Sequence, residues 1–335
     1  MARTALTDAN KLSTAAIFDE LRDTRVKQDR HAERVLELGR VLEQRGALKG
    51  GKDQSWDSME QVVLAGVECG QLELAEILSY RLLTHFSSTP HRVAYLRGLL
   101  LECKGNLVGA RELYEQCLND DETDVNSRKR LIALHLSSPL FELPSGKGSA
   151  SSPAQQSYLS ASLSRQKGIS LLTQYLDTYY ADLSGWLTLS THYASLALYP
   201  QALTALSHAV ILAPHDPWVA LKFAETAYTA GEVHMAWKEY LRVIEMSTEE
   251  GDEVPLKGAA RRAAMGAKLN GREVQCIPRL RSLAAPADPL LAPAKLDEID
   301  LLLSRLLLDA YTKTDGAVGL GIVRRWLGGT GEETK

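Results

Sequence analysis

Apolar residues between positions 186 and 214 recur at the spacing of two amphipathic helices. Trp186, Leu189 and Tyr193 are three and four residues apart, so they fall on one face of a first helix. Ala202 opens the apolar stripe of a second segment, and its small side chain suits a close crossing of two helices. Pro214 cannot continue a helix and therefore ends that segment. The pattern predicts a pair of antiparallel helices.

This pair matches the tetratricopeptide pattern, in which a helix–turn–helix unit repeats every 34 residues. The alanine at Ala202 recurs 34 residues later at Ala236, and Ala110 and Ala75 occupy the same slot earlier in the chain. Glycine suits the turn between two helices because it adopts a positive φ at little cost. Three units carry glycine there: Gly70, Gly105 and Gly231. These four units predict an array of stacked helical hairpins.

A fifth unit fits between Ala110 and Trp186. Its first helix is expected over residues 125–136 and its second over 166–179. Residues 137–164 between them are rich in Ser, Pro, Gly and Ala, a composition typical of segments that bury too little apolar surface to order. We therefore expect a flexible insertion in the turn.

The array is expected to end in capping helices on both sides. We assign residues 1–55 to N-terminal capping helices, 56–246 to the repeats, and 247–335 to C-terminal helices interrupted by a Pro-rich loop at 276–295. The fold class predicted is all-α: a right-handed tetratricopeptide α-solenoid with capping helices at both ends.

Composition excludes several functions. The 335 residues are 45% hydrophobic and 24% charged, with a net charge of −4, so no global positive field favours nucleic acid. Residues 1–8 lack the apolar stretch of a secretory signal. The Leu-rich run at 301–311 is shorter than a bilayer span and contains Arg305 and Asp309. Any membrane association is expected to come through partners.

The chain carries no recognisable catalytic or metal-binding motif. The glycines Gly319 and Gly321 lack the rest of a dinucleotide fingerprint, and we expect them in a loose terminus. The histidine pairs at 85/91 and 208/215 have no Cys or acidic residue at metal-ligand spacing, which favours turn histidines. The four cysteines form no C-x-x-C pair and are expected to be reduced core thiols. We therefore expect no enzyme activity, cofactor or metal.

The first helix of each repeat is expected to supply a concave, partner-binding face. Its register also predicts that Leu99 and Leu221 are exposed there. The basic run 128–130 could contact phosphate or an acidic protein, or form a solvated helix face. The aromatic candidates could instead be packing residues. The candidates for partner binding are Arg92, Tyr95, Lys129, Arg130, Trp218 and Tyr228.

Several segments together resemble one family. Residues 127–133 open a repeat with the basic triplet 128–130, which the general tetratricopeptide pattern does not require. Residues 56–90 and the unit at 186–214 carry the same resemblance. On these segments the chain resembles subunit 2 of the endoplasmic reticulum (ER) membrane protein complex, over roughly residues 12–269. It departs from that family at 137–164, where the family has a short turn, and in the length of the loop from Cys276.

The resemblance implies a role. That complex inserts transmembrane segments, including tail anchors, into the ER membrane. Its subunit 2 is a non-catalytic scaffold on the cytoplasmic face, which holds cytosolic parts of membrane subunits and a soluble subunit. The implied partners are therefore other subunits of the complex, and the implied location is peripheral.

Other classes of function remain alternatives. The first is a peptide-binding cochaperone or adaptor, in which Lys and Asn one turn apart hold a C-terminal carboxylate. The equivalent pairs here, such as Lys129 with Ala133 and Leu221 with Glu225, do not combine Lys with Asn. A helical-repeat enzyme lacks an acid, base or nucleophile cluster, and an RNA-binding repeat protein fits poorly with the net negative charge.

Overall fold

A computed structural model describes residues 9–29, 31–49, 53–86, 91–137, 153–247, 256, 258–276, 293–314 and 316–327. The regular elements within these ranges are all helices, so the all-α prediction is confirmed. Among the helices described, none is both long enough and apolar enough to cross a membrane.

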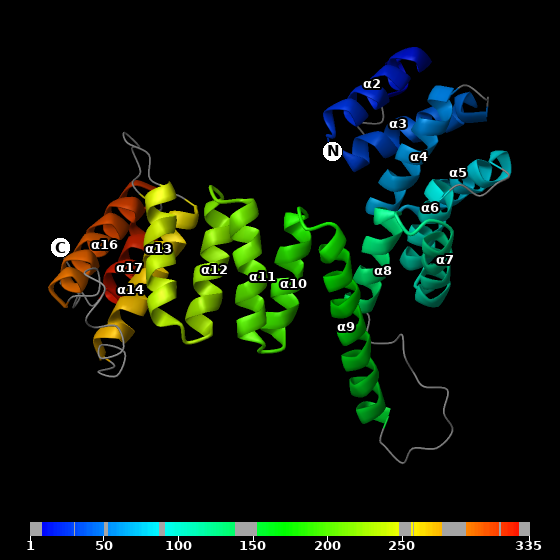
Figure 1. The fold of residues 1–335 in the computed structure, drawn as a ribbon. Helices are drawn as coiled ribbons and strands as arrows, with labels where there is room; N and C mark the ends of the chain where they lie inside the picture. The colour runs from blue at the N-terminus through cyan, green and yellow to red at the C-terminus, as the bar shows by residue number, and fades with distance from the viewer. Residues whose placement is uncertain are drawn as a thin grey trace. The chain divides into compact units, whose positions relative to one another are not determined.

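Contacts divide the chain into two units, Met1–Leu171 and Leu172–Lys335. Helix α9 crosses the boundary between them (Figure 1). The first unit contains α2 (Thr14–Lys27), α3 (Ala32–Gln44), a 3-10 turn (Ala47–Lys49), α4 (Asp53–Glu68), α5 (Leu72–His85), α6 (His91–Cys103), α7 (Leu107–Asp120), α8 (Val125–Ser137) and most of α9 (Pro153–Thr178). The second contains α10 (Leu183–Ser195), α11 (Tyr199–Leu212), α12 (Pro217–Thr229), α13 (Val233–Ser247), α14 (Ala259–Cys276), α16 (Pro293–Thr314) and α17 (Gly316–Trp326).

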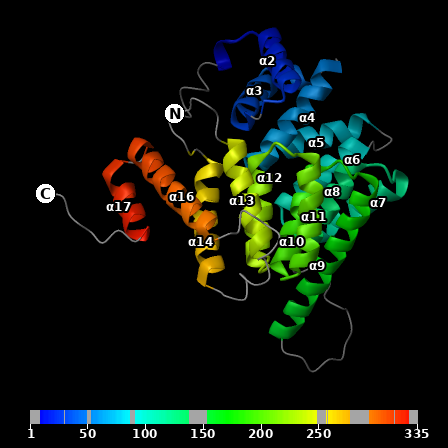
Figure 2. The same ribbon diagram turned by 60° about the vertical axis from the view of Figure 1, so that its left-hand side comes forward.

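Successive helices pair as the repeat pattern predicts. In the first unit α4 packs on α5 and α6 on α7, and in the second α10 packs on α11 and α12 on α13. Helices α10 to α13 stand side by side in both views (Figures 1 and 2). Helices α14, α16 and α17 follow α13 and extend the second unit by further packed helices.

The turns inside the hairpins share one geometry. Gly70, Gly105 and Gly231 have φ values of 68°, 78° and 85°. The residue after each donates its N–H to the carbonyl five residues back, at 2.8 or 2.9 Å, which is the Schellman arrangement. In the repeat that opens at Trp186, Ala197 fills this slot with a φ of 58°. A Cβ atom makes that conformation costly, so this turn is strained where the others are not.

The repeat at 186–214 otherwise follows its sequence pattern closely. Ala202, Leu206 and Ala209 are fully buried on α11, and Leu189 is 3% exposed on α10. The Trp186 indole stacks on His208 with ring centroids 4.4 Å apart, and its N–H donates to the Tyr180 carbonyl at 2.8 Å. Trp186 therefore fastens the two helices of its own hairpin.

The two units have separate cores of different composition. The first core holds large aliphatic side chains from α2 to α6, with alanine at only three of its buried positions: Ala9, Ala65 and Ala75. In the second core, which extends from α12 to α16, alanine makes up more than half of the buried residues. Alanine lets helix backbones approach closely, whereas leucine and valine fill wider gaps.

Both units also place a glycine against a tyrosine ring. A Cβ atom on Gly98 of α6 would lie 2.4 Å from Tyr114 Cε1 on α7. A Cβ atom on Gly266 of α14 would lie 2.6 Å from Tyr240 Cε1 on α13. Both tyrosines are almost fully buried, so each glycine is required by a close approach of its helix to a ring.

The expected flexible insertion at 137–164 is partly wrong. Helix α9 begins at Pro153 rather than at Gln166, and Ser164 is fully buried, donating its hydroxyl to the His135 carbonyl at 3.0 Å. Proline suits the first position of a helix, and serine can occupy a helix when its hydroxyl finds a carbonyl. A high serine content therefore did not prevent residues 153–164 from forming a helix. Residues 138–152 lie outside the described part of the chain.

The C-terminal region differs from expectation in two places. Cys276 ends α14 and Pro293 begins α16, so both ends of the stretch assigned to a Pro-rich loop at 276–295 are helical, and the residues between them lie outside the described ranges. Gly319 and Gly321, expected in a loose terminus, instead belong to α17. Val323 is 5% exposed and Trp326 packs against the second core, so burial offsets the low helix propensity of glycine.

Candidate partner-binding groove

The first helices of two successive repeats, α4 and α6, border a groove in the first unit. Two adjoining hollows of about 250 Å³ and about 420 Å³ share Asp57, Glu60 and Arg92. We call this surface the α4–α6 groove. The residues that line the first hollow are Trp56, Asp57, Glu60, Leu82, Phe86, Arg92, Val93 and Leu96.

The floor of the first hollow is apolar and rigid. Leu82, Val93 and Leu96 are at most 4% exposed and belong to the first core. Trp56 stacks on His85 with ring centroids 3.9 Å apart and meets Phe86 edge-on at 5.6 Å. The aromatic wall is therefore held in place before any ligand arrives, which lowers the entropy cost of binding.

The rim of the groove is charged. Arg92 donates from Nε and Nη2 to the two carboxylate oxygens of Glu60, at 3.2 and 2.5 Å, across neighbouring repeats. On the far side Arg25 donates to the Ser58 hydroxyl at 3.4 Å and to Gln61 Oε1 at 3.2 Å. Asp57 is exposed at the mouth. An apolar floor with a fixed polar rim suits the side chain of a docked helix or loop.

A similar cross-repeat pair lies further along the same unit. Arg130 donates to both carboxylate oxygens of Glu102, with the Nε bond at 3.1 Å, and the Tyr114 hydroxyl donates to Glu102 at 2.7 Å. Burial, the largest cause, and this hydrogen bond raise the pKa of Tyr114. Tyr95 is half-buried between two clusters of core residues, and burial raises its pKa as well. Tyr95 and Tyr114 are therefore largely committed to packing, and Arg130 to its pair with Glu102.

The three residues of the basic run at 128–130 have different surroundings in the structure. Arg130 is bound by Glu102, and Arg128 donates to the Glu122 carbonyl at 2.6 Å. Lys129 on α8 is the exposed member of this run, whereas Arg128 and Arg130 are half-buried.

In the second unit the two aromatic candidates differ. Trp218, near the start of α12, is 55% exposed, whereas Tyr228 packs against the second core. On the same helix Glu225 accepts two bonds from Arg262 of α14, at 2.5 and 2.9 Å. Cross-repeat Arg–Glu pairs therefore occur in both units.

Two residues expected on the concave face are buried instead. Leu99 is 7% exposed and Leu221 is 2% exposed. Each first helix packs against the other helix of its own hairpin and against neighbouring hairpins, so its buried face includes these two leucines. The six candidate residues themselves fall in separate units: four in the first and two in the second.

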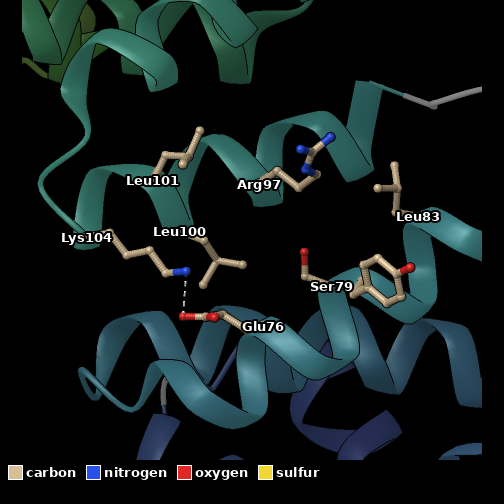
Figure 3. A pocket seen from close by; sticks show the side chains of 8 residues that line it. Glu76, Ser79, Leu83, Arg97, Leu100, Leu101 and Lys104 are labelled. Atoms are coloured by element: carbon tan, nitrogen blue, oxygen red, sulfur yellow. Dashed lines mark ion pairs between the residues drawn. The ribbon is translucent and has the colours of Figure 1, made fainter.

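A further hollow of about 360 Å³ lies between α5 and α6 (Figure 3). Lys104 pairs with Glu76 at 2.8 Å across one end, and Leu100 and Leu83 face the space between the helices. Tyr80 also lines this hollow and is 67% exposed. Its mixed lining offers less apolar depth than the α4–α6 groove.

The structure reveals one cluster that sequence spacing missed. His91 lies beside Cys117 and Asp124, although the sequence shows no Cys or acid at ligand spacing from that histidine. These residues come from the start of α6, the last turn of α7 and the residue before α8, so no short motif signals them. Cys103, expected in the core, is exposed, whereas Cys117 is buried.

Comparisons with known proteins bear on the family resemblance seen in the sequence. No family model matches the chain. ER membrane protein complex subunit 2-A of Xenopus laevis is 29% identical over 213 residues, which are 64% of this chain and 63% of that protein. ER membrane protein complex subunit 2 of Dictyostelium discoideum is 28% identical over 198 residues, which are 59% and 54% of the two chains.

The predicted resemblance is confirmed. The chain is similar to ER membrane protein complex subunit 2, and it spans less than two thirds of the length of these relatives. TPR repeat protein oca3 of Schizosaccharomyces pombe is 25% identical over 226 residues, which are 66% of this chain and 71% of that protein. The C-terminal part of a TPR repeat-containing protein from Cytophaga hutchinsonii has a TM-score of 0.53 at 12% identity, covering 87% of this chain and 98% of that one. This last likeness supports the tetratricopeptide fold alone.

Proposed function

We propose that this chain is a non-catalytic scaffold subunit of the ER membrane protein complex. On this proposal it lies peripherally on the cytoplasmic face of the ER membrane. It supports the insertion of transmembrane segments, including tail anchors, by holding cytosolic parts of the membrane subunits and a soluble subunit. The observation that carries the proposal is the similarity to subunit 2 of that complex over 64% of the chain.

The α4–α6 groove is the part of the first unit that we assign to partner binding. Its apolar floor is preorganised by the Trp56–His85 stack, and Arg92 is fixed by Glu60. The exposed carboxylate of Asp57 at the mouth favours a partner segment that carries an apolar anchor next to a basic residue. Lys129 and Trp218 remain predicted contacts elsewhere, because both are exposed.

Purification of the tagged chain from detergent-solubilised membranes tests the proposal. We expect the other subunits of the ER membrane protein complex to co-purify in fixed proportion. Recovery of soluble chaperones alone would sink the scaffold proposal and favour the cochaperone alternative.

A charge reversal separates the groove from the rest of the surface. We expect Asp57→Lys to lower recovery of the complex at least about tenfold, because a like charge then faces the basic residue of the partner. Glu112→Lys is the matched control, since Glu112 is an exposed acid on α7 that does not line the groove. Equal recovery with both variants would remove the groove from the binding surface while leaving membership of the complex intact.

A further inference from the structure

Three side chains able to bind a metal ion meet where α6, α7 and α8 converge. His91 is the first residue of α6, Cys117 lies in the last turn of α7, and Asp124 immediately precedes α8. Their candidate ligand atoms all lie within 4.8 Å of one another. The fold, rather than the local sequence, brings these atoms together.

The set of donor atoms favours zinc. An imidazole nitrogen, a thiolate sulfur and a carboxylate oxygen are the three ligand types that zinc takes in proteins, whereas calcium and magnesium prefer oxygen. Ligand atoms around a tetrahedral zinc lie about 3.5 Å apart. The present spacing, within 4.8 Å, has to close to that value when the ion binds. Three protein ligands leave a fourth position open.

Asp124 is already oriented for such a role. Its Oδ1 accepts the N–H of Asn126 at 3.0 Å, and its Oδ2 accepts the Ser127 hydroxyl at 2.6 Å. Hydrogen bonds of this kind fix the orientation of a ligating carboxylate. Oδ1 also accepts the Ser127 N–H at 3.4 Å. A carboxylate has about four acceptor positions, so these three bonds leave one for a metal ion.

The negative charges beside Cys117 favour a cation, whereas burial does not. Burial, chiefly, raises the pKa of the Cys117 thiol, and the charges of Asp124 and Asp120 raise it further, against a hydrogen bond with Ser127. A metal ion must therefore displace the thiol proton. His91 and Asp124 are half-buried, so the cluster can be reached from the surface. When the ion binds, a zinc–sulfur bond replaces the sulfur–hydrogen bond and the proton passes to water.

We propose that His91, Cys117 and Asp124 form a zinc site that fastens the start of one repeat to the start of the next. The open fourth position takes water or a ligand from a bound protein. The competing explanation is that Asp124 acts solely as the N-cap of α8 and the other two residues are ordinary neighbours. The two explanations differ in whether the chain binds a thiophilic ion.

Cobalt titration of the full chain, reduced with a phosphine, tests the proposal, because thiolate–cobalt bonds give a near-ultraviolet charge-transfer absorption. We expect one equivalent of Co²⁺ to produce this band and zinc to displace it. Cys117→Ser is expected to abolish the band, whereas Cys103→Ser, which removes an exposed thiol one helix earlier, keeps it. His91→Ala is expected to weaken cobalt binding at least about tenfold.

Three results would overturn the site. The first is the absence of the band in the unchanged protein, and the second is its survival in Cys117→Ser. If circular dichroism shows that Cys117→Ser has lost helix, the cobalt affinity of His91→Ala becomes the deciding measurement. That variant should keep the fold, because His91 is half-buried and lies at the start of a helix. Unchanged cobalt affinity in that variant, the third result, would remove His91 from the ligands and overturn the proposed site.

Discussion

The two units bury their helices by different means. The core of the first unit is built from Leu, Val and Ile side chains, and its helices are held apart by them. The core of the second is mostly alanine, so its helices cross with little side-chain volume between them. The first core is stable because large side chains fill the space between helices, and the second because small side chains let the helices approach closely. Loss of side-chain volume should therefore be the costly change in the first unit, and added volume the costly change in the second.

The largest effect is expected from removing volume in the first unit. Leu78 on α5 is fully buried, so Leu78→Ala should lower the free energy of unfolding by about 2–5 kcal/mol through lost burial and a residual cavity. The neighbouring Ile77 is 50% exposed and serves as the control, with a much smaller cost for Ile77→Ala. Hydrogen exchange read by mass spectrometry would assign the loss to peptides of the first unit. Similar losses in both variants would contradict a core that depends on volume.

Adding volume should disturb the second unit. Ala263 on α14 is fully buried among other alanines, so Ala263→Leu should cost about 1–3 kcal/mol by forcing helices apart. Thr204→Leu, on the exposed side of α11, controls for the added side chain itself. Thermal unfolding of both variants measures the difference. An unchanged melting temperature for Ala263→Leu would show that the alanine core has spare room.

The smallest expected effect is a gain. Ala197 holds a φ of 58° in the slot where three other repeats have glycine. Ala197→Gly should raise stability by about 0.5–1 kcal/mol, because relief of the left-handed strain exceeds the added flexibility of the unfolded chain. Gly231→Ala, in the equivalent turn, should act in the reverse direction. A lower melting temperature for Ala197→Gly would mean that the Ala197 side chain contributes packing that outweighs the strain.

Buried alanines also explain which helices could be predicted from the sequence. Ala202 and Ala236 are diagnostic because close crossings admit few other residues, and both are fully buried. The start of α9 and the whole of α17 could not be predicted, since local composition there favours loops. In these places a tertiary contact decides, such as the Ser164 bond to His135 or the burial of Val323.

The candidate site was harder to predict than the fold. The sequence singled out Arg92 by its register, and the structure places that residue at the rim of a groove. Asp57 and Phe86 were missed, because the groove forms between two repeats and no single repeat contains it. For the same reason no spacing rule could find His91, Cys117 and Asp124.

The cross-repeat Arg–Glu pairs also bear on how the chain folds. Glu43 pairs with Arg81, Glu60 with Arg92, Glu102 with Arg130, and Glu225 with Arg262, at separations of 28 to 38 residues. Contacts at such short separations along the chain close small loops, and proteins built from them fold rapidly. Each hairpin can therefore find its partner soon after it leaves the ribosome. Early repeats are then ordered before the last helices are synthesised.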